Sequence, residues 1–403
     1  MNLKALEAGG PYQLQIIGKE NQISIKDILI GDVWLCSGQS NMQWVVNNVT
    51  NAEVEKKNAN YPQIRTLNIP RRMELSPKDT ISATWLVCSP ENVGRFSGVA
   101  YFFAKKVYEE TNVPIGIINS SWGGTIVETW TSLEAANTLP QKRLDRYNKN
   151  EKLFPPTEYL TRKNKEAKRN DYPSLVYNAM IHPLLSFSIK GVLWYQGENN
   201  VGNAEPYTDW LTCMIGDWRN RWNSELPFYI IQLPNFDSIN KKPLWAEMRD
   251  AQSKVLAVPG THLIVTSDLG DPYDLHPRNK QRVGMRAALQ ALHYEYGYSD
   301  IVSESPMFER MEINGDKVII TFKNTGSSLE IRSRYGCLQG FAIAGEDKKF
   351  HWALGELKDN RIVIWSPKVP NPVAVRYNWE NNPDGNLYNK DGLPACLFRT
   401  DNW

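Results

Sequence analysis

The fold of this chain is decided by residues 32–44, which read DVWLCSGQSNMQW. Within it, Val33–Cys36 is a short apolar run of the kind that forms a buried strand. Gly38 then permits a sharp turn, which leaves Ser40 at the start of the next segment. A serine in that place is either a helix cap, since serine is a preferred helix starter, or a nucleophile at a strand end. Taken alone, Ser40 is better explained as a cap.

Outward from this stretch, short apolar runs alternate with longer segments of helical periodicity. That alternation is typical of parallel strands joined by crossover helices. We therefore predict a doubly wound α/β layer on a five-stranded parallel sheet. The predicted strands are Val33–Cys36, Ile115–Asn119, Gly191–Tyr195, Phe228–Leu233 and His262–Ser267, and the predicted helices are Val99–Glu110, Tyr207–Trp222, Trp245–Leu256 and Arg278–Tyr296.

β structure is predicted on both sides of this layer. Residues 12–30 alternate between apolar and polar around a turn at residues 18–21, which indicates a hairpin. After about residue 300, runs closed by Asn-Gly, Gly-Glu-Asp and Lys-Asp-Asn turns predict an all-β unit. We expect a hairpin remnant of an N-terminal β domain over residues 1–30, an α/β domain over 31–300 and a C-terminal β domain over 301–403.

One segment, residues 141–171, differs from the rest in its charge. It holds ten Lys or Arg against five Asp or Glu and few apolar residues. A charge run of this kind is usually a solvated face, so we interpret the segment as a solvated helical excursion. The alternative interpretation is a lid over the site.

Composition excludes several classes of function. The chain of 403 residues is 41% hydrophobic and 22% charged, which is enough for a large core and excludes disorder as its main state. A net charge of +2 gives no overall attraction to nucleic acid or anionic membrane. No apolar run reaches the roughly 18 residues of a membrane span, and the first ten residues lack a secretory signal pattern. The five widely spaced cysteines indicate neither a disulfide framework nor a zinc site, and we expect no metal and no cofactor.

Polar groups follow the predicted strands at the edge where ligands of α/β sheets gather. The second strand is followed by Gly123 and Gly124, which allow a backbone N–H to point into a cleft. The third ends in a polar run that contains the amides of Gln196 and Asn199. With the N–H of Ser40, a glycine N–H and one of these amides could bind an oxyanion.

The last predicted strand leads to His276, which lies near Asp271 and Asp274 and just before a helix expected to begin at Pro277. A hydroxyl becomes a good nucleophile when a neutral imidazole takes its proton, and a carboxylate orients that imidazole. Ser40, His276 and one aspartate supply this set.

The other histidines are better explained by structural roles. His262 falls in a predicted strand, His293 in a predicted helix and His351 in the β region. His182 precedes a proline and is harder to assign, but a structural role is still the simpler interpretation.

Four motifs occur in the order seen in SGNH/GDSL-type hydrolases: GQSNM at residues 38–42, WGGT at 122–125, YQGE at 195–198 and DLHP at 274–277. More closely, the chain resembles the sialate O-acetylesterases and related carbohydrate acetylesterases, over roughly residues 12–403. Several fixed motifs in order make coincidence negligible.

The resemblance implies an SGNH-like fold in which Ser40 is the nucleophile and His276 the general base, with an acetyl-enzyme intermediate. The superfamily places its aspartate three residues before the histidine, where this chain has Tyr273. We assign the role to Asp274, with Asp271 or a backbone carbonyl as the alternatives. Asn199 and Gln196 both stay candidates for the oxyanion site.

The expected substrate is an acetylated carbohydrate, with sialic acids preferred. An acetylxylan or other polysaccharide acetylesterase would share the chemistry. A catalytically inactive glycan-binding module is the alternative of another class, suggested by the 14 tryptophans. Neither nucleic acid nor membrane is expected as a partner. Relatives usually carry a signal peptide, which implies a periplasmic or extracellular location although none is recognised here.

Overall fold

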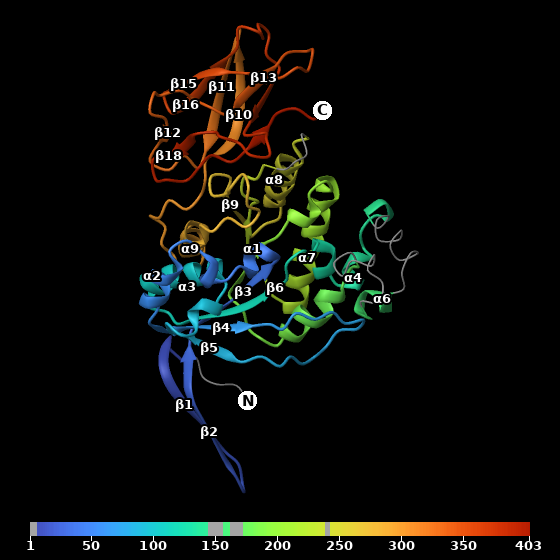
Figure 1. Ribbon diagram of the computed structural model, residues 1–403, viewed down its shortest axis with the longest axis vertical. Coiled ribbons are helices and arrows are strands. Elements are labelled where there is room, and N and C mark those ends of the chain that lie inside the picture. Colours follow the sequence, from blue (N-terminus) through green and yellow to red (C-terminus); the bar gives the residue numbers. More distant parts are fainter. Residues whose placement is uncertain (1–5, 144–155, 162–171, 238–241) are drawn as a thin grey trace.

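The computed structural model describes residues 6–143, 156–161, 172–237 and 242–403. Its centre is a mostly parallel sheet, with a two-stranded hairpin projecting at one end and antiparallel sheets at the other (Figure 1). Among the described residues, none of the helices is both long enough and apolar enough to cross a membrane. Most of the charged segment 141–171 lies outside the described residues, apart from its first three residues and the short helix α6 (Pro156–Thr161).

The central sheet has seven strands within the described residues, so the predicted count of five was wrong. Its strands, in spatial order, are β5 (Trp85–Cys88), β4 (Tyr61–Asn68), β6 (Ile115–Ser121), β3 (Asp32–Gly38), β7 (Gly191–Tyr195), β8 (Phe228–Ile231) and β9 (Thr261–Ile264). All five predicted strands are present. The two that were missed form one edge, where β5 pairs antiparallel to β4.

Both missed strands give weak sequence signals. β4 carries Pro62 and Arg65 among its apolar residues, and β5 is only four residues long. Proline cannot donate to a sheet ladder and is usually confined to edges or strand starts. Pairing with β6 over Ile64–Asn68, rather than local alternation, makes this segment a strand.

β3 lies between β6 and β7, with both pairings parallel. The chain leaves β3 for β4 and β6 on one side and later returns to β7 on the other. The carboxyl end of β3 is therefore a topological switch point, the place where ligands of such sheets bind.

Two pairs of helices cover the two faces of the sheet. α3 (Gly98–Thr111) and α9 (Lys280–Glu295) pack on the face that receives Trp34 and Cys36 of β3. α7 (Ala204–Trp222) and α8 (Leu244–Lys254) pack on the opposite face, which receives Leu35. Successive strand residues point to opposite faces, so β3 is buried on both sides.

Smaller elements complete this layer. Their bounds are α1 (Ser40–Gln43), α2 (Ala52–Asn58) and α4 (Leu133–Ala136). A 3₁₀ helix at Glu198–Asn200 follows β7. α1 begins directly after β3, as the turn at Gly38 predicted.

The predicted N-terminal hairpin is present as β1 (Gly9–Ile17) and β2 (Gln22–Ile30). The predicted C-terminal β structure is present as three antiparallel sheets, which pack on a core that includes Phe341, Tyr377 and Phe398. Their strands are β10 (Met307–Asn314), β11 (Lys317–Lys323), β16 (Arg361–Trp365) and β15 (Leu354–Lys358); β14 (His351–Trp352), β13 (Phe341–Ala344), β17 (Ala374–Tyr377) and β19 (Phe398–Arg399); and β12 (Leu329–Ile331) with β18 (Leu387–Asn389).

Candidate functional site

Ser40 stands at the carboxyl edge of the central sheet because the turn after β3 is unusually tight. Gly38 has a φ of +132°, and a Cβ there would lie 2.1 Å from the carbonyl oxygen of Tyr195, so only glycine fits. The next N–H, of Gln39, donates to that same oxygen at 2.9 Å. The structure makes Gln39 the N-cap of α1 and Ser40 its first residue. The interpretation of Ser40 as the helix cap was therefore wrong.

The side chain of Gln39 joins this turn to the loop after β7. Its Oε1 accepts from Nε2 of Gln196 at 3.1 Å and from the N–H groups of Gly197 and Asn199 at 3.3 Å each. One buried amide thus fixes the polar loop beside the start of α1.

The two predicted amide donors differ in what they already bind. Gln196 is fully buried, and its Nε2 donates to Gln39, to the carbonyl of Thr125 and to Asn200 Oδ1. Asn199 Nδ2 donates to the carbonyl oxygen of Gly124 at 2.6 Å and is bound to the glycine turn rather than to the interior.

The glycine turn after β6 lies directly against Ser40. A Cβ on Gly123 would lie 3.2 Å from Cβ of Ser40, which is closer than ordinary carbon contacts. The N–H of Gly123 donates to Oε1 of Gln43 at 2.8 Å. Gln43 therefore holds the turn in place and occupies one of the predicted oxyanion donors.

The structure also brings the histidine loop to α1. The ring of His276 stacks on that of Trp44, with centroids 4.9 Å apart and an interplanar angle of 10°. Beside it, Asn41 Nδ2 donates to the carbonyl oxygen of Leu275 at 3.1 Å. Ser40 and His276, far apart in sequence, are thus carried by segments in direct contact.

The imidazole of His276 makes no hydrogen bond to Ser40 among the described residues. Its Nε2 is buried and has no hydrogen-bond partner in the part of the chain that the structure describes. In proteins without substrate, such catalytic bonds are often long and shorten on binding. Burial, followed by the nearby charge of Lys280, lowers the pKa of His276, whereas Asp274 raises it.

Both candidate aspartates bind backbone groups of the histidine loop. Asp274 Oδ1 accepts from the N–H of His276 at 2.8 Å, and Asp271 Oδ1 accepts from the N–H of Tyr273 at 2.8 Å. The helix after this loop begins at Lys280 rather than at Pro277, so that prediction was wrong. Asn279 is its cap, with a side chain that accepts from the N–H of Arg282.

Five residues that contact the site had no assigned role in the sequence analysis. Asn41, Gln43 and Trp44 belong to the decisive stretch, where their apolar or amide character gave no separate signal. Glu198 and Lys280 meet at Asn41: Glu198 Oε1 accepts from Asn41 Nδ2 at 2.5 Å, and Lys280 Nζ donates to Asn41 Oδ1 at 2.5 Å. Asn41 and Glu198 belong to the GQSNM and YQGE motifs and Lys280 follows His276 by four residues, but nothing in the sequence indicated that the three meet.

The C-terminal sheets also reach the histidine loop. Asn235 Oδ1 accepts from the N–H of Gly270 at 2.7 Å, and its Nδ2 donates to Asn382 Oδ1 at 2.6 Å. Asn382 follows β17, so the C-terminal region supports the loop that carries His276.

The other histidines lie in structural surroundings. His262 is in β9 between the rings of Tyr229 and Tyr294, and burial lowers its pKa to about 4. His182 Nδ1 lies 3.0 Å from the carbonyl oxygen of Lys78. His293 is in α9, and His351 is in β14.

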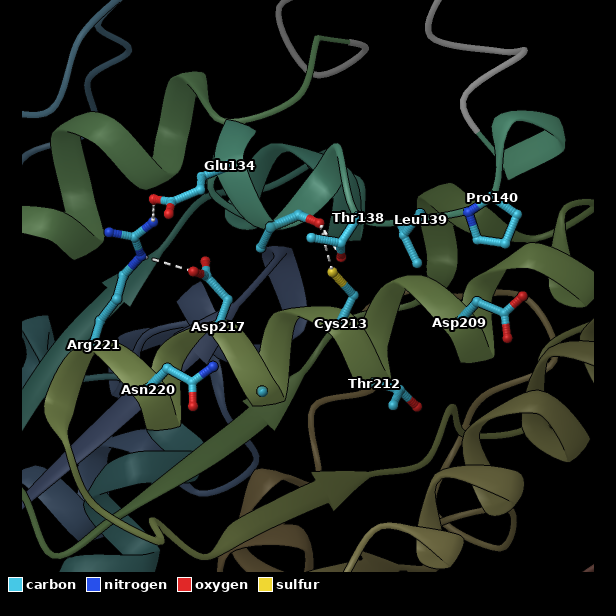
Figure 2. Close-up of a pocket in the computed structure, with 12 residues that line it drawn as sticks. Glu134, Thr138, Leu139, Pro140, Asp209, Thr212, Cys213, Asp217, Asn220 and Arg221 are labelled. Atoms are coloured by element: carbon cyan, nitrogen blue, oxygen red, sulfur yellow. Dashed lines mark hydrogen bonds and ion pairs between the residues drawn. The ribbon is translucent and has the colours of Figure 1, made fainter.

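A pocket of about 700 Å³ lies elsewhere, between α4 and α7 (Figure 2). Its charged side chains are paired: Arg221 binds Asp217 and Glu134, and Asp209 binds Arg143 outside the lining. Burial raises the pKa of Cys213 to about 11, so its thiol is protonated. None of its lining residues is a predicted site residue, and we place the candidate site at the end of β3 instead.

The chain matches known carbohydrate esterases over most of its length. The family described as "Carbohydrate esterase, sialic acid-specific acetylesterase" matches residues 30–293. The sialate O-acetylesterase of Homo sapiens is 32% identical over 356 residues, covering 79% of this chain and 64% of that protein. That of Mus musculus is 31% identical over 431 residues, covering 94% of this chain and 79% of that protein.

Among solved structures, a novel carbohydrate acetylesterase from Xanthomonas citri superimposes with a TM-score of 0.89 at 39% identity, covering all of this chain and 88% of that one. The chain spans somewhat less than two thirds of the length of the human relative. The family match nevertheless covers the central sheet and both segments that meet at Ser40. The chain belongs to the carbohydrate esterase family of sialic acid-specific acetylesterases.

Proposed function

We propose that this chain is a serine esterase of the SGNH type that removes O-acetyl groups from carbohydrates, with sialic acids as the preferred substrate class. The observation that carries the proposal is the contact between two segments: His276 stacks on Trp44, and Asn41 binds the carbonyl of Leu275. That contact places an imidazole beside the serine turn at a switch point of the sheet. A periplasmic or extracellular location is part of the proposal by family resemblance.

In the proposed reaction, Ser40 Oγ attacks the acetyl carbonyl while Nε2 of His276 takes the hydroxyl proton. His276 then gives this proton to the sugar oxygen as the ester bond to the sugar breaks, and the acetyl group stays bonded to Ser40. Water then attacks the acetyl-enzyme, again with His276 as the base, and acetate is released. This assignment is supported by the buried Nε2, because no described residue forms a competing hydrogen bond with it.

For the oxyanion, we assign the N–H of Ser40 together with the side-chain amide of Asn199, because the N–H of Gly123 is already bound to Gln43. The first N–H groups of a helix have no intrahelical partner, which favours Ser40 as a donor. Asn199 lies on the glycine turn through its bond to Gly124. Gln196 is the weaker candidate, because its buried amide already donates within the interior.

Asp274 is assigned as the residue that supports His276. It holds the backbone N–H of the histidine, and its charge favours the imidazolium that forms when the proton is transferred. It therefore acts as a positioning residue rather than by binding substrate.

The test is the rate of acetate release by Ser40→Ala and by the wild-type chain on p-nitrophenyl acetate and on acetylated sialosides. We expect kcat to fall by several orders of magnitude, since the members of such a set act as a unit. Ser37→Ala is the matched control: Ser37 lies on β3, and its hydroxyl is buried without a partner in the described structure, so its removal should leave the rate unchanged. Wild-type turnover by Ser40→Ala would remove Ser40 from the mechanism.

The same assay separates the alternatives. Faster release from acetylated xylo-oligosaccharides than from sialosides would favour a polysaccharide acetylesterase. Tight glycan binding by the wild-type chain without acetate release would favour a binding module, a possibility that rests on its aromatic content.

A further inference from the structure

A lysine is fully buried beside the candidate site. Lys280, the first residue of α9, has no exposed surface, and its ammonium lies 5.6 Å from the ring centroid of Tyr195. Burial of an ammonium is costly unless partners compensate for the lost water. α3 leaves room for this side chain, because a Cβ at Gly98 would lie 3.2 Å from Cβ of Lys280.

The partner that Lys280 binds is Asn41, the residue after Ser40. Lys280 Nζ donates to Asn41 Oδ1 at 2.5 Å. The Nδ2 group of Asn41 donates to the carbonyl oxygen of Leu275 at 3.1 Å and to Glu198 Oε1 at 2.5 Å. Both the oxygen and the NH₂ group of this buried amide are therefore hydrogen-bonded, to residues from three different segments.

This arrangement gives the amide a single productive orientation. An ammonium only donates, so it selects the oxygen of Asn41 and directs the NH₂ group towards Leu275 and Glu198. Leu275 precedes His276, and Asn41 follows Ser40. The orientation of one amide thus controls how the serine turn meets the histidine loop.

We propose that Lys280 is a positioning residue for the esterase reaction: by binding Oδ1 of Asn41, it fixes the amide that joins the turn of Ser40 to the loop of His276. This inference rests on the proposed function of Ser40 and His276. Lys280 itself is buried, and among the described residues its ammonium hydrogen-bonds to Asn41 and not to Ser40 or His276.

The charge of Lys280 has a second effect on the same histidine. The ionisable groups that face Lys280 are Glu198 and Tyr195 from the β7 side, and Asp274 and His276 from the histidine loop. Burial lowers the pKa of Lys280 to about 7, while Glu198 and Asp274 raise it. A neighbouring cation disfavours protonation of His276, so a charged Lys280 keeps the imidazole neutral and able to act as a base.

The test compares Lys280→Met with Arg282→Met. Methionine keeps much of the length of lysine without its charge, and Arg282 is a cation on the same helix with a half-exposed side chain. For Lys280→Met we expect kcat to fall roughly 10- to 100-fold with KM nearly unchanged, because positioning acts on the chemical step. We also expect the acidic limb of kcat/KM to move to higher pH. Arg282→Met should show neither change.

Thermal unfolding distinguishes this effect from a loss of fold. Removal of one member of a group of buried charges can destabilise the fold by itself, so a folded but slow Lys280→Met variant is the result that would support positioning. If Lys280→Met does not fold, Asn41→Ser provides the second measurement. It removes the amide but keeps the lysine, so kcat should fall.

A folded Lys280→Met variant with wild-type kcat and an unchanged pH profile would overturn the inference. If Lys280→Met does not fold, a folded Asn41→Ser variant with wild-type kcat would overturn it. Ser40→Ala keeps the two proposals distinguishable. An inactive Ser40→Ala together with a fully active Lys280→Met refutes only the role of Lys280. An active Ser40→Ala refutes the esterase mechanism and this inference with it.

Discussion

The change Asp274→Asn distinguishes two ways in which this carboxylate could serve His276. In the structure, Asp274 Oδ1 accepts from the backbone N–H of His276 at 2.8 Å. Asparagine keeps an acceptor there but removes the charge. A hydrogen bond to a charged group contributes about 1.5–3 kcal/mol and a neutral one about 0.5–1.5 kcal/mol, so this bond should weaken by roughly 1 kcal/mol.

The charge itself adds a second contribution. Asp274 favours the imidazolium form of His276, and both side chains are partly exposed, where a charge pair contributes on the order of 1 kcal/mol or less. Together the two losses come to at most about 2 kcal/mol, which limits the fall in kcat/KM to roughly 30-fold. Where the carboxylate binds the imidazole itself, as in a Ser-His-Asp triad, the same Asp→Asn substitution lowers kcat about 10⁴-fold.

The measurement is kcat/KM on p-nitrophenyl acetate from about pH 5 to pH 9, around the reference pKa of histidine, with circular dichroism to check the fold. Asp271→Asn is the matched control, because Asp271 makes a bond of the same length to the N–H of Tyr273 in the same loop. Its rate should stay within about twofold of wild type, as for most surface changes. A loss of roughly 10⁴-fold in folded Asp274→Asn would refute this reasoning and assign Asp274 to the imidazole.

Three further outcomes are expected. Burial and the charge of Lys280 lower the pKa of His276, and a general base acts in its neutral form. We therefore expect kcat/KM to rise with pH and to reach half its maximum below about pH 6.5. A midpoint above neutrality, with chemistry rate-limiting, would contradict this. Trp44→Ala removes the ring that stacks on the imidazole, an interaction of about 0.5–1.5 kcal/mol. We expect kcat/KM to fall roughly 2- to 12-fold, with Trp44→Phe closer to wild type. Equal rates for both variants and wild type would show that the stack does not position the ring. Gln43→Ala removes the side chain that accepts from the N–H of Gly123 at 2.8 Å. The loss of about 1 kcal/mol should lower kcat about fivefold. A change confined to KM would instead assign Gln43 to substrate binding.

Much of the fold could be predicted from the sequence because its signals are local. Apolar runs and helical periodicity located five strands and four helices of the α/β layer, each to within a few residues. β4 and β5 escaped because one contains Pro62 and Arg65 and the other is only four residues long. Their strand conformation depends on pairing with β6 and with each other, which no local pattern records.

For the site, the sequence by itself determined which residue types stand at the strand ends: a serine after β3, glycines after β6, amides after β7 and an acid-flanked histidine before α9. Parallel strands bring their carboxyl ends to one edge, so this much follows from order along the chain.

Only the tertiary structure decided how those groups are used. It made Ser40 the first residue of α1 rather than its cap, and it directed Asp274 to a backbone N–H. It also placed Lys280 on the amide of Asn41. These choices depend on hydrogen bonds between segments up to 239 residues apart. Such bonds form only after several elements have packed together, and hydrophobic periodicity carries no information about them.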